Sequence, residues 1–142
     1  MINSIELAAK NFCTHQLGIK CKNREKYNGM RTFIAYIDIV VKNKEKYRVF
    51  LAANEEFIQS VATLFLEEEK SDEETLKDMT LETANLIIGS AKVLAQESES
   101  PYDIGTPYFQ DVTAFSIACD EIVTLSNGES ELIIAIKELD AS

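Results

Sequence analysis

Four polar or small residues fall on one side of the segment Asp78–Lys92, namely Asp78, Glu82, Asn85 and Gly89. At about 100° per residue in a helix, the other three lie within about 60° of Glu82. A carboxylate can exchange protons or pair with a cation, and a carboxamide can donate to and accept from the same water. A helix that carries this stripe therefore presents acid, amide and open backbone to a binding partner.

The individual residues of this stripe leave other readings open. Asp78 and Glu82 could be a general acid and base, yet carboxylates four residues apart are also common on exposed helix faces. Asn85 could be hydrogen-bonded inside a helix–helix contact, with Gly89 as a close-packing position. The choice between these readings depends on what surrounds the helix.

Apolar residues border the stripe and also fill the opposite side of the helix. Met79, Leu86 and Val93, each seven residues apart, lie about 20–60° from Glu82 on its other flank, so we expect them to form an apolar contact surface. The opposite side is a wide apolar arc, as in a helix that packs on a core. Its members are Leu76, Leu81, Ala84, Ile87, Ile88, Ala91, Leu94 and Ala95.

Several other catalytic arrangements are disfavoured by the sequence. The five glycines are scattered and form no phosphate-binding loop, and there is no nucleophile elbow. His15 is the single histidine, for which we expect a solvated or structural role. The three cysteines, Cys13, Cys21 and Cys119, lack metal-site spacing, so we expect reduced thiols and no zinc site.

Length and charge narrow the class of protein further. A chain of 142 residues with 46% apolar residues predicts one globular domain, residues 1–142. A net charge of −10 disfavours binding to nucleic acid or to an anionic membrane, and no apolar run approaches the ~18 residues of a membrane span. With no leader segment visible, we expect a cytoplasmic protein. Basic residues cluster early, and the acidic second half suits a basic partner.

Hydrophobic periodicity and turn residues predict the elements that position the stripe. In chain order we expect a helix over 2–17, strands over 19–27, 31–42 and 47–52, and helices over 55–67 and 72–97. A loop over 98–110 and strands over 111–125 and 131–138 should follow. The strand over 111–125 is either unbroken or broken near Cys119–Asp120. Turn signals stand at Asn28-Gly29, Lys42–Lys46 and Asn127-Gly128. This order predicts an α+β fold, a mainly antiparallel sheet with helices packed on one face.

Two helix starts carry specific capping signals. Asn54 precedes two glutamates and can cap the helix over 55–67. Ser71 followed by Glu74 is typical of a capping box for the helix over 72–97.

The stripe, taken with a later proline, resembles the signature of the CheC/CheX family of chemotaxis phosphatases. That signature is Asp or Ser, three residues, Glu, two residues, Asn and, about twenty-two residues later, Pro. Here Asp78, Glu82 and Asn85 have the same spacing and twenty-one residues separate Asn85 from Pro107, with Pro101 as the alternative proline. The segment LETANLIIGSAK and the element order are similar too. One copy of the motif resembles CheX rather than CheC, which carries two.

The resemblance implies a phosphatase that removes phosphate from the aspartate of a CheY-type response regulator. It implies that Glu82 and Asn85 are catalytic, Asn85 fixing the attacking water and Glu82 pairing with the regulator's lysine. Asp78, Met79, Leu86, Gly89 and Val93 would then contact the partner, with Gly89 allowing close backbone approach and Asp78 in a supporting role.

The same resemblance implies that the chain has no metal or cofactor of its own. The Mg²⁺ would belong to the phosphorylated receiver domain. The family also suggests a homodimer. The alternative function is a non-catalytic receiver-binding adaptor, or an assembly module like the flagellar switch proteins that share this fold.

Overall fold

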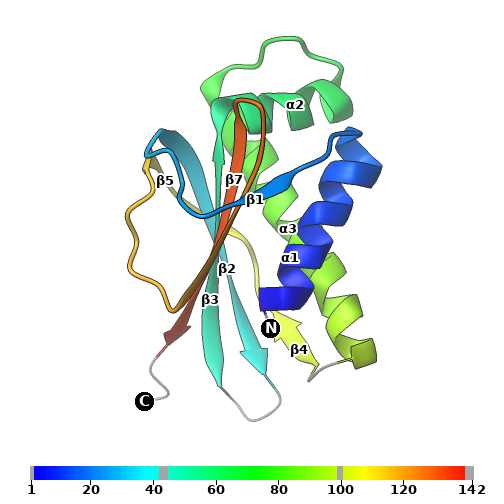
Figure 1. Cartoon of the computed structure of the whole chain (residues 1–142), viewed down its shortest axis with the longest axis vertical. Coiled ribbons are helices and arrows are strands. Elements are labelled where there is room, and N and C mark those ends of the chain that lie inside the picture. The colour runs from blue at the N-terminus through cyan, green and yellow to red at the C-terminus, as the bar shows by residue number, and fades with distance from the viewer. Residues whose placement is uncertain (1, 42–44, 99–100, 140–142) are drawn as a thin grey trace.

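The computed structural model describes residues 2–41, 45–98 and 101–139, and shows a twisted antiparallel sheet with helices on one face (Figure 1). The strand order is β1-β6-β7-β3-β2-β4, and β5 also pairs with β2. The strands are β1 (Lys22–Arg24), β2 (Arg31–Val41), β3 (Lys46–Asn54), β4 (Tyr102–Ile104), β5 (Tyr108–Ala114), β6 (Glu121–Asn127) and β7 (Ser130–Leu139). The predicted α+β class and arrangement are confirmed.

The helices are α1 (Ile2–Asn11), which continues as the π-helical segment η1 (Phe12–Leu17), α2 (Glu55–Leu66) and α3 (Glu73–Ser98). Figure 1 shows α1 and α3 side by side on one face of the sheet, with α2 across the end of the sheet near the start of α3. The expected helix over 2–17 is therefore present, with its last six residues wound more widely than an α-helix.

The core lies on both faces of the sheet at β2 and β3. Phe33, Ala35, Ile37 and Ile39 of β2 point into the main core beneath the helices, while Ile34 belongs to a smaller cluster on the other face. That smaller cluster is closed by the connection between β5 and β6, whose Phe115 is buried. A central strand with apolar residues on both faces was predicted for this segment and is confirmed.

The start of the sheet differs from the prediction. The strand expected over 19–27 is only three residues long, and β1 pairs with β6 at one edge of the sheet rather than with β2. The turn signal at Asn28-Gly29 therefore closes no hairpin. Instead the chain passes from β1 to β2 across the sheet, and the Asn28 N–H donates to the Glu131 carboxylate at 3.1 Å. A tertiary contact has overridden the local signal.

The segment after α3 also differs from the prediction. The expected loop over 98–110 contains β4 and the first part of β5, both antiparallel to β2. The strand expected over 111–125 is broken at residues 115–120, as one of the two alternatives allowed. The Asn127-Gly128 hairpin is confirmed, since Asn127 pairs with Ser130. The β2–β3 hairpin is confirmed by its strand pairing, but its residues 42–44 lie outside the described residues.

Both long helices begin at side-chain caps. The Asn54 side chain accepts from the Phe57 N–H at 3.0 Å, as predicted. The capping box at Ser71 is wrong, because the Thr75 N–H donates to Asp72 Oδ1 at 2.8 Å. Ser71 is held elsewhere, its N–H donating to Gln59 Oε1 of α2 at 2.8 Å. Within the described ranges, no helix combines the length and the apolar character needed to cross a membrane.

Candidate functional site

The stripe on α3 lies at the surface of a helix that is otherwise embedded in the protein. Ala84, Ile87, Ile88 and Ala91 are fully or almost fully buried beneath it. The side chains of Asp78, Glu82 and Asn85 are exposed, and within the described residues none of them makes a hydrogen bond or ion pair. The possibility that Asn85 is hydrogen-bonded inside a helix–helix contact is therefore wrong. Three polar side chains are thus free to meet a partner.

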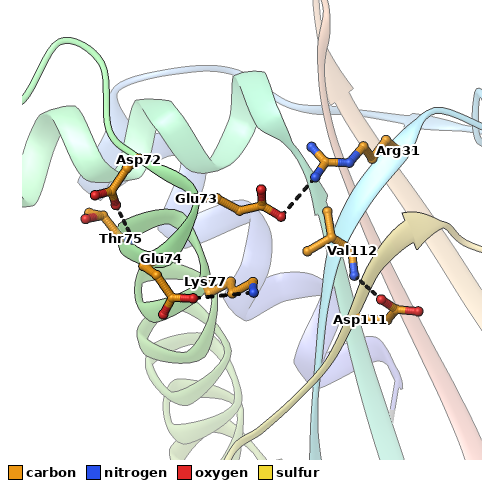
Figure 2. A network of polar contacts seen from close by, with 8 residues as sticks. All are labelled: Arg31, Asp72, Glu73, Glu74, Thr75, Lys77, Asp111 and Val112. Carbon is orange, nitrogen blue, oxygen red and sulfur yellow. Dashed lines mark hydrogen bonds and ion pairs between the residues drawn. The ribbon is translucent and has the colours of Figure 1, made fainter.

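Polar contacts at its first turn fix α3 against the sheet (Figure 2). Arg31 of β2 forms an ion pair with Glu73 at 3.0 Å, and the Asp72 carboxylate caps the helix. The hydrogen bond from the Thr75 backbone lowers the pKa of Asp72. Because cap and ion pair both act on this first turn, the stripe begins on a part of the helix that is held in place.

The β4–β5 segment borders the stripe on one side. Lys92 of α3 lies 3.8 Å from an Asp103 carboxylate oxygen, and the Lys77 Nζ lies 5.6 Å from the ring centre of Phe109. Pro107 stands between these two contacts in the chain, whereas Pro101 precedes both. Pro107 therefore lies in the β4–β5 loop, between the two residues that contact Lys92 and Lys77 of α3.

That loop is itself held to the sheet. The Gly105 N–H donates to the Asp38 carbonyl of β2 at 2.9 Å, and a Cβ at Gly105 would come within 3.3 Å of the same oxygen. Glycine at this position allows the chain to lie close to β2 before it turns into β5. The β4–β5 loop beside the stripe is thus attached to β2 of the sheet.

An apolar groove borders the stripe on the other side. It has a volume of about 460 Å³ and lies between α3, α1, η1 and the end of α2. Leu86 and Val93, which border the stripe, line it and are exposed, as predicted. The remaining lining residues are Ala8, Asn11, Phe12, His15, Gln16, Phe65, Ser90 and Leu94. The groove adjoins the stripe, because these two residues border the stripe and also line the groove.

Met79 does not belong to this exposed border. Its side chain is only 7% exposed and packs in the main core, so the prediction of a surface contact residue is wrong. Met79 shares the main core with Phe57 and Val61 of α2, and the buried side of α3 is therefore wider there than farther along.

Gly89 is open to its surroundings. A Cβ built at this position meets no atom within 4 Å beyond the helix itself and the chain neighbours. The close-packing role that the sequence left open for Gly89 is therefore wrong. The glycine leaves a flat, uncovered surface beside Asn85 and Leu86 on the helix.

Sequence reasoning missed the part of the groove wall that comes from η1. Phe12, His15 and Gln16 are more than sixty residues before the stripe, and no local pattern connects them with it. The apolar spacing of residues 2–17 indicated that the helix has a packing side, but not that its partner is α3. Among the described residues, no three His, Cys, Asp or Glu side chains are grouped so as to hold a metal ion.

Comparison with known proteins gives a consistent result. The family model described as chemotaxis phosphatase CheX matches residues 35–134. The crystal structure of the chemotaxis protein CheX from Vibrio vulnificus has a TM-score of 0.79 at 20% identity, covering 97% of this chain and 98% of that one. A CheC-like superfamily protein from Shewanella sp. PV-4 has a TM-score of 0.78 at 21% identity, covering 98% and 97%.

A further similar structure is a complex. The CheX of the CheX–CheY–BeF₃–Mg²⁺ complex from Borrelia burgdorferi has a TM-score of 0.67 at 21% identity, covering 96% of this chain and 97% of that one. The chain matches no curated protein by sequence comparison.

Proposed function

Because the chain belongs to the CheX family of chemotaxis phosphatases, we propose that it hydrolyses the phospho-aspartate of a CheY-type response regulator. The observation that carries the proposal is the pair Glu82 and Asn85, exposed, unpaired among the described residues and one turn apart on a helix whose other side is core. Such a pair can enter a partner's active site without rearrangement of the fold.

Asn85 would position the water that attacks phosphorus. Hydrolysis of an acyl phosphate requires a water in line with the leaving oxygen, so positioning accounts for most of the catalysis. A carboxamide can accept a hydrogen bond from the water O–H and donate one to the water oxygen, and it is not consumed. An exposed Asn85 without a competing hydrogen-bond partner is well suited to this role.

Glu82 would hold the receiver in register. A carboxylate on the same side of the helix, three residues before Asn85, can accept a charge-assisted hydrogen bond from the lysine ammonium of the receiver's phosphate site. Asp78 lies one turn farther away and would support the contact. Glu82 therefore contributes chiefly to binding, and Asn85 to the chemical step.

Leu86, Val93 and Gly89 would complete the contact surface. The first two offer exposed apolar area next to the catalytic pair, and Gly89 leaves room for backbone to come close. Met79 is excluded from this surface by its burial. The Mg²⁺ would come with the receiver, where it neutralises phosphate charge.

The proposal is tested by adding the protein to a phosphorylated CheY-type receiver with Mg²⁺ and measuring phosphate release. We expect the wild type to accelerate release and Asn85→Ala to lose about 10²–10³-fold of the saturated rate. Alanine has a higher helix propensity than asparagine, so this loss would not reflect unfolding. Glu82→Ala should mainly raise the concentration of protein needed for half-maximal rate.

Gln96→Ala is the matched control, since Gln96 is another exposed amide on α3, eleven residues beyond Asn85. Its rate should equal that of the wild type. If the wild type binds the receiver but leaves the phosphate lifetime unchanged, the catalytic proposal is wrong, and the protein is an adaptor or an assembly module.

We also propose a cytoplasmic homodimer, on the family resemblance. Its mass in solution would be about twice the 15.9 kDa of the chain, and a mass of 15.9 kDa across the micromolar range would contradict the dimer without touching the proposed chemistry.

A further inference from the structure

Two of the three cysteines meet at the end of the first helix. The Sγ atoms of Cys13 and Cys21 lie 2.9 Å apart, although the residues are eight positions apart in the chain. The chain turns back at Gly18, whose φ of 67° is left-handed, and the Cys13 carbonyl accepts from the N–H groups of Gly18 and Ile19. Glycine allows this reversal without strain, so the approach of the thiols is part of the local fold.

Both cysteines are held by structure outside this turn. Cys13 lies in η1, is fully buried and packs in the main core. Cys21 directly precedes β1, where Lys22 pairs with Ser126 of β6, and the Asn127 side chain donates to the Lys20 carbonyl at 2.7 Å. The pairing of the thiols is therefore fixed by the core on one side and by the sheet on the other.

The two thiols differ in accessibility and in acidity. Cys21 is partly exposed, whereas Cys13 is covered. The hydrogen bond between the two thiols lowers the pKa of Cys21, and the same contact together with burial raises the pKa of Cys13. Cys21 thus presents the thiolate that an oxidant can reach, with a second thiol directly behind it.

We propose that Cys13 and Cys21 form a redox-active pair that a peroxide converts into an intramolecular disulfide. The Cys21 sulfur attacks one peroxide oxygen, the O–O bond breaks, and the thiol becomes a sulfenic acid with release of water. The Cys13 sulfur then attacks the sulfenic sulfur, its proton leaves with the departing hydroxide as a second water, and the S–S bond forms. Two electrons pass from the thiols to one peroxide molecule.

The movement that this reaction requires is small. The sulfurs must close from 2.9 Å to the disulfide length of about 2.05 Å. The bond would fix η1 to the chain just before β1. Phe12 and His15 of η1 line the groove beside Leu86, so the oxidised state constrains one wall of that groove. The disulfide itself does not depend on the proposed phosphatase activity.

The experiment is a titration of the reduced full chain with hydrogen peroxide, followed by thiol counting under denaturing conditions and peptide mass mapping. We expect free thiols to fall from three to one, with the peptides 11–20 and 21–22 of a tryptic digest linked and separated again by dithiothreitol. Cys119→Ser is the matched control. Cys119 is partly exposed and lies in the β5–β6 connection, and its removal should leave the linkage unchanged.

Cys21→Ser tests the order of the two steps. Cys13 should then remain a free thiol at peroxide concentrations that oxidise the wild type, because it is buried and has lost its reactive neighbour. In urea, where the fold no longer holds the two thiols together, the Cys13–Cys21 link should form more slowly than in the native wild type, although the short loop still favours it over a link to Cys119. Persistence of all three thiols in the native wild type, or a main product linked through Cys119, would overturn the proposal.

Discussion

At the scale of single residues, α3 separates the side chains that hold the fold from those that can act on a partner. Ala84 and Ile88 are buried, while Glu82 and Asn85, on the other side of the helix, are exposed and unpaired among the described residues. Helical periodicity alone assigns these sides, which is why the stripe could be predicted from the sequence. Substitutions in the stripe should therefore change activity with little effect on stability.

Gly89→Ala tests this separation. Beyond the helix itself and the chain neighbours, the added methyl group meets no atom within 4 Å, and alanine stabilises a helix interior by about 1 kcal/mol relative to glycine, so the free energy of unfolding should rise by up to that amount. If receiver backbone approaches Gly89, the half-saturating concentration in the phosphate-release assay should rise at the same time. Urea denaturation and the assay together measure both effects.

Ser90→Ala provides the comparison for Gly89→Ala, because Ser90 is an exposed neighbour on the groove side. It should leave receiver binding close to that of the wild type. A Gly89→Ala protein with wild-type binding would show that no partner backbone comes close at this point, and the proposed contact surface would have to exclude Gly89.

Met79 shows what periodicity cannot predict. Its angle on the helix is close to that of Leu86, yet one is buried and the other exposed. The difference arises because α2 packs against the beginning of α3, and the extent of that coverage depends on a tertiary contact. A helical wheel gives the direction of a side chain but not how far the neighbouring elements cover it.

At the scale of elements, the strongly periodic segments were predicted well and the short strands were not. α2 and α3 begin and end within one residue of the expected bounds. β4 has three residues between two prolines and is a strand only because β2 lies beside it. The Asn28-Gly29 signal failed for a similar reason, since β1 pairs with β6. Local composition carries no information about such partners.

Asn54 joins three elements, and its loss should be costly. Its Oδ1 accepts from the N–H groups of Phe57 and Glu131, both at 3.0 Å, and its Nδ2 donates to the Glu129 carbonyl at 2.6 Å. Asn54→Ala removes the cap of α2, leaves the buried Glu131 N–H of β7 without this acceptor and takes a donor from the Glu129 carbonyl in the β6–β7 turn. We expect a loss of about 2–4 kcal/mol in the free energy of unfolding, measured by urea denaturation.

Asn11→Ala is the control for that measurement. Asn11 precedes η1, is exposed and makes no capping hydrogen bond with its side chain, so its replacement should change stability by less than about 0.5 kcal/mol. Equal losses for the two variants would mean that the hydrogen bonds of Asn54 contribute little beyond those that water provides in the unfolded chain.

At the scale of the whole molecule, the sequence predicted the layers but not the strand order. Hairpin signals give neighbours such as β6 and β7, whereas the pairing of β7 with β3 joins segments about eighty residues apart. That pairing joins strands from the second half of the chain to the strands from the first half in one sheet. α3 packs on β2, and α1 and η1 form the facing wall of the groove, so the groove next to the stripe exists only in the complete fold.

The charge of the molecule is also a property of the whole chain, and it leads to the last prediction. The net charge is −10, and Asp78 and Glu82 present exposed carboxylates where the proposed receiver lysine would arrive. Raising NaCl from about 0.1 M to 1 M shortens the Debye length from about 10 Å to about 3 Å. The half-saturating concentration for receiver dephosphorylation should therefore rise with salt. Both the electrostatic attraction of the receiver lysine to these carboxylates during association and its ion pair with Glu82 in the complex weaken.

The saturated rate should respond much less to salt, since the water that Asn85 is proposed to hold would act after the complex has formed. Glu82→Gln keeps the size of the side chain and removes its charge, so its half-saturating concentration should depend less on salt than that of the wild type. Tighter receiver binding at high salt in the wild type would instead assign the association chiefly to the apolar groove and remove Glu82 from its proposed role as a partner for a cation.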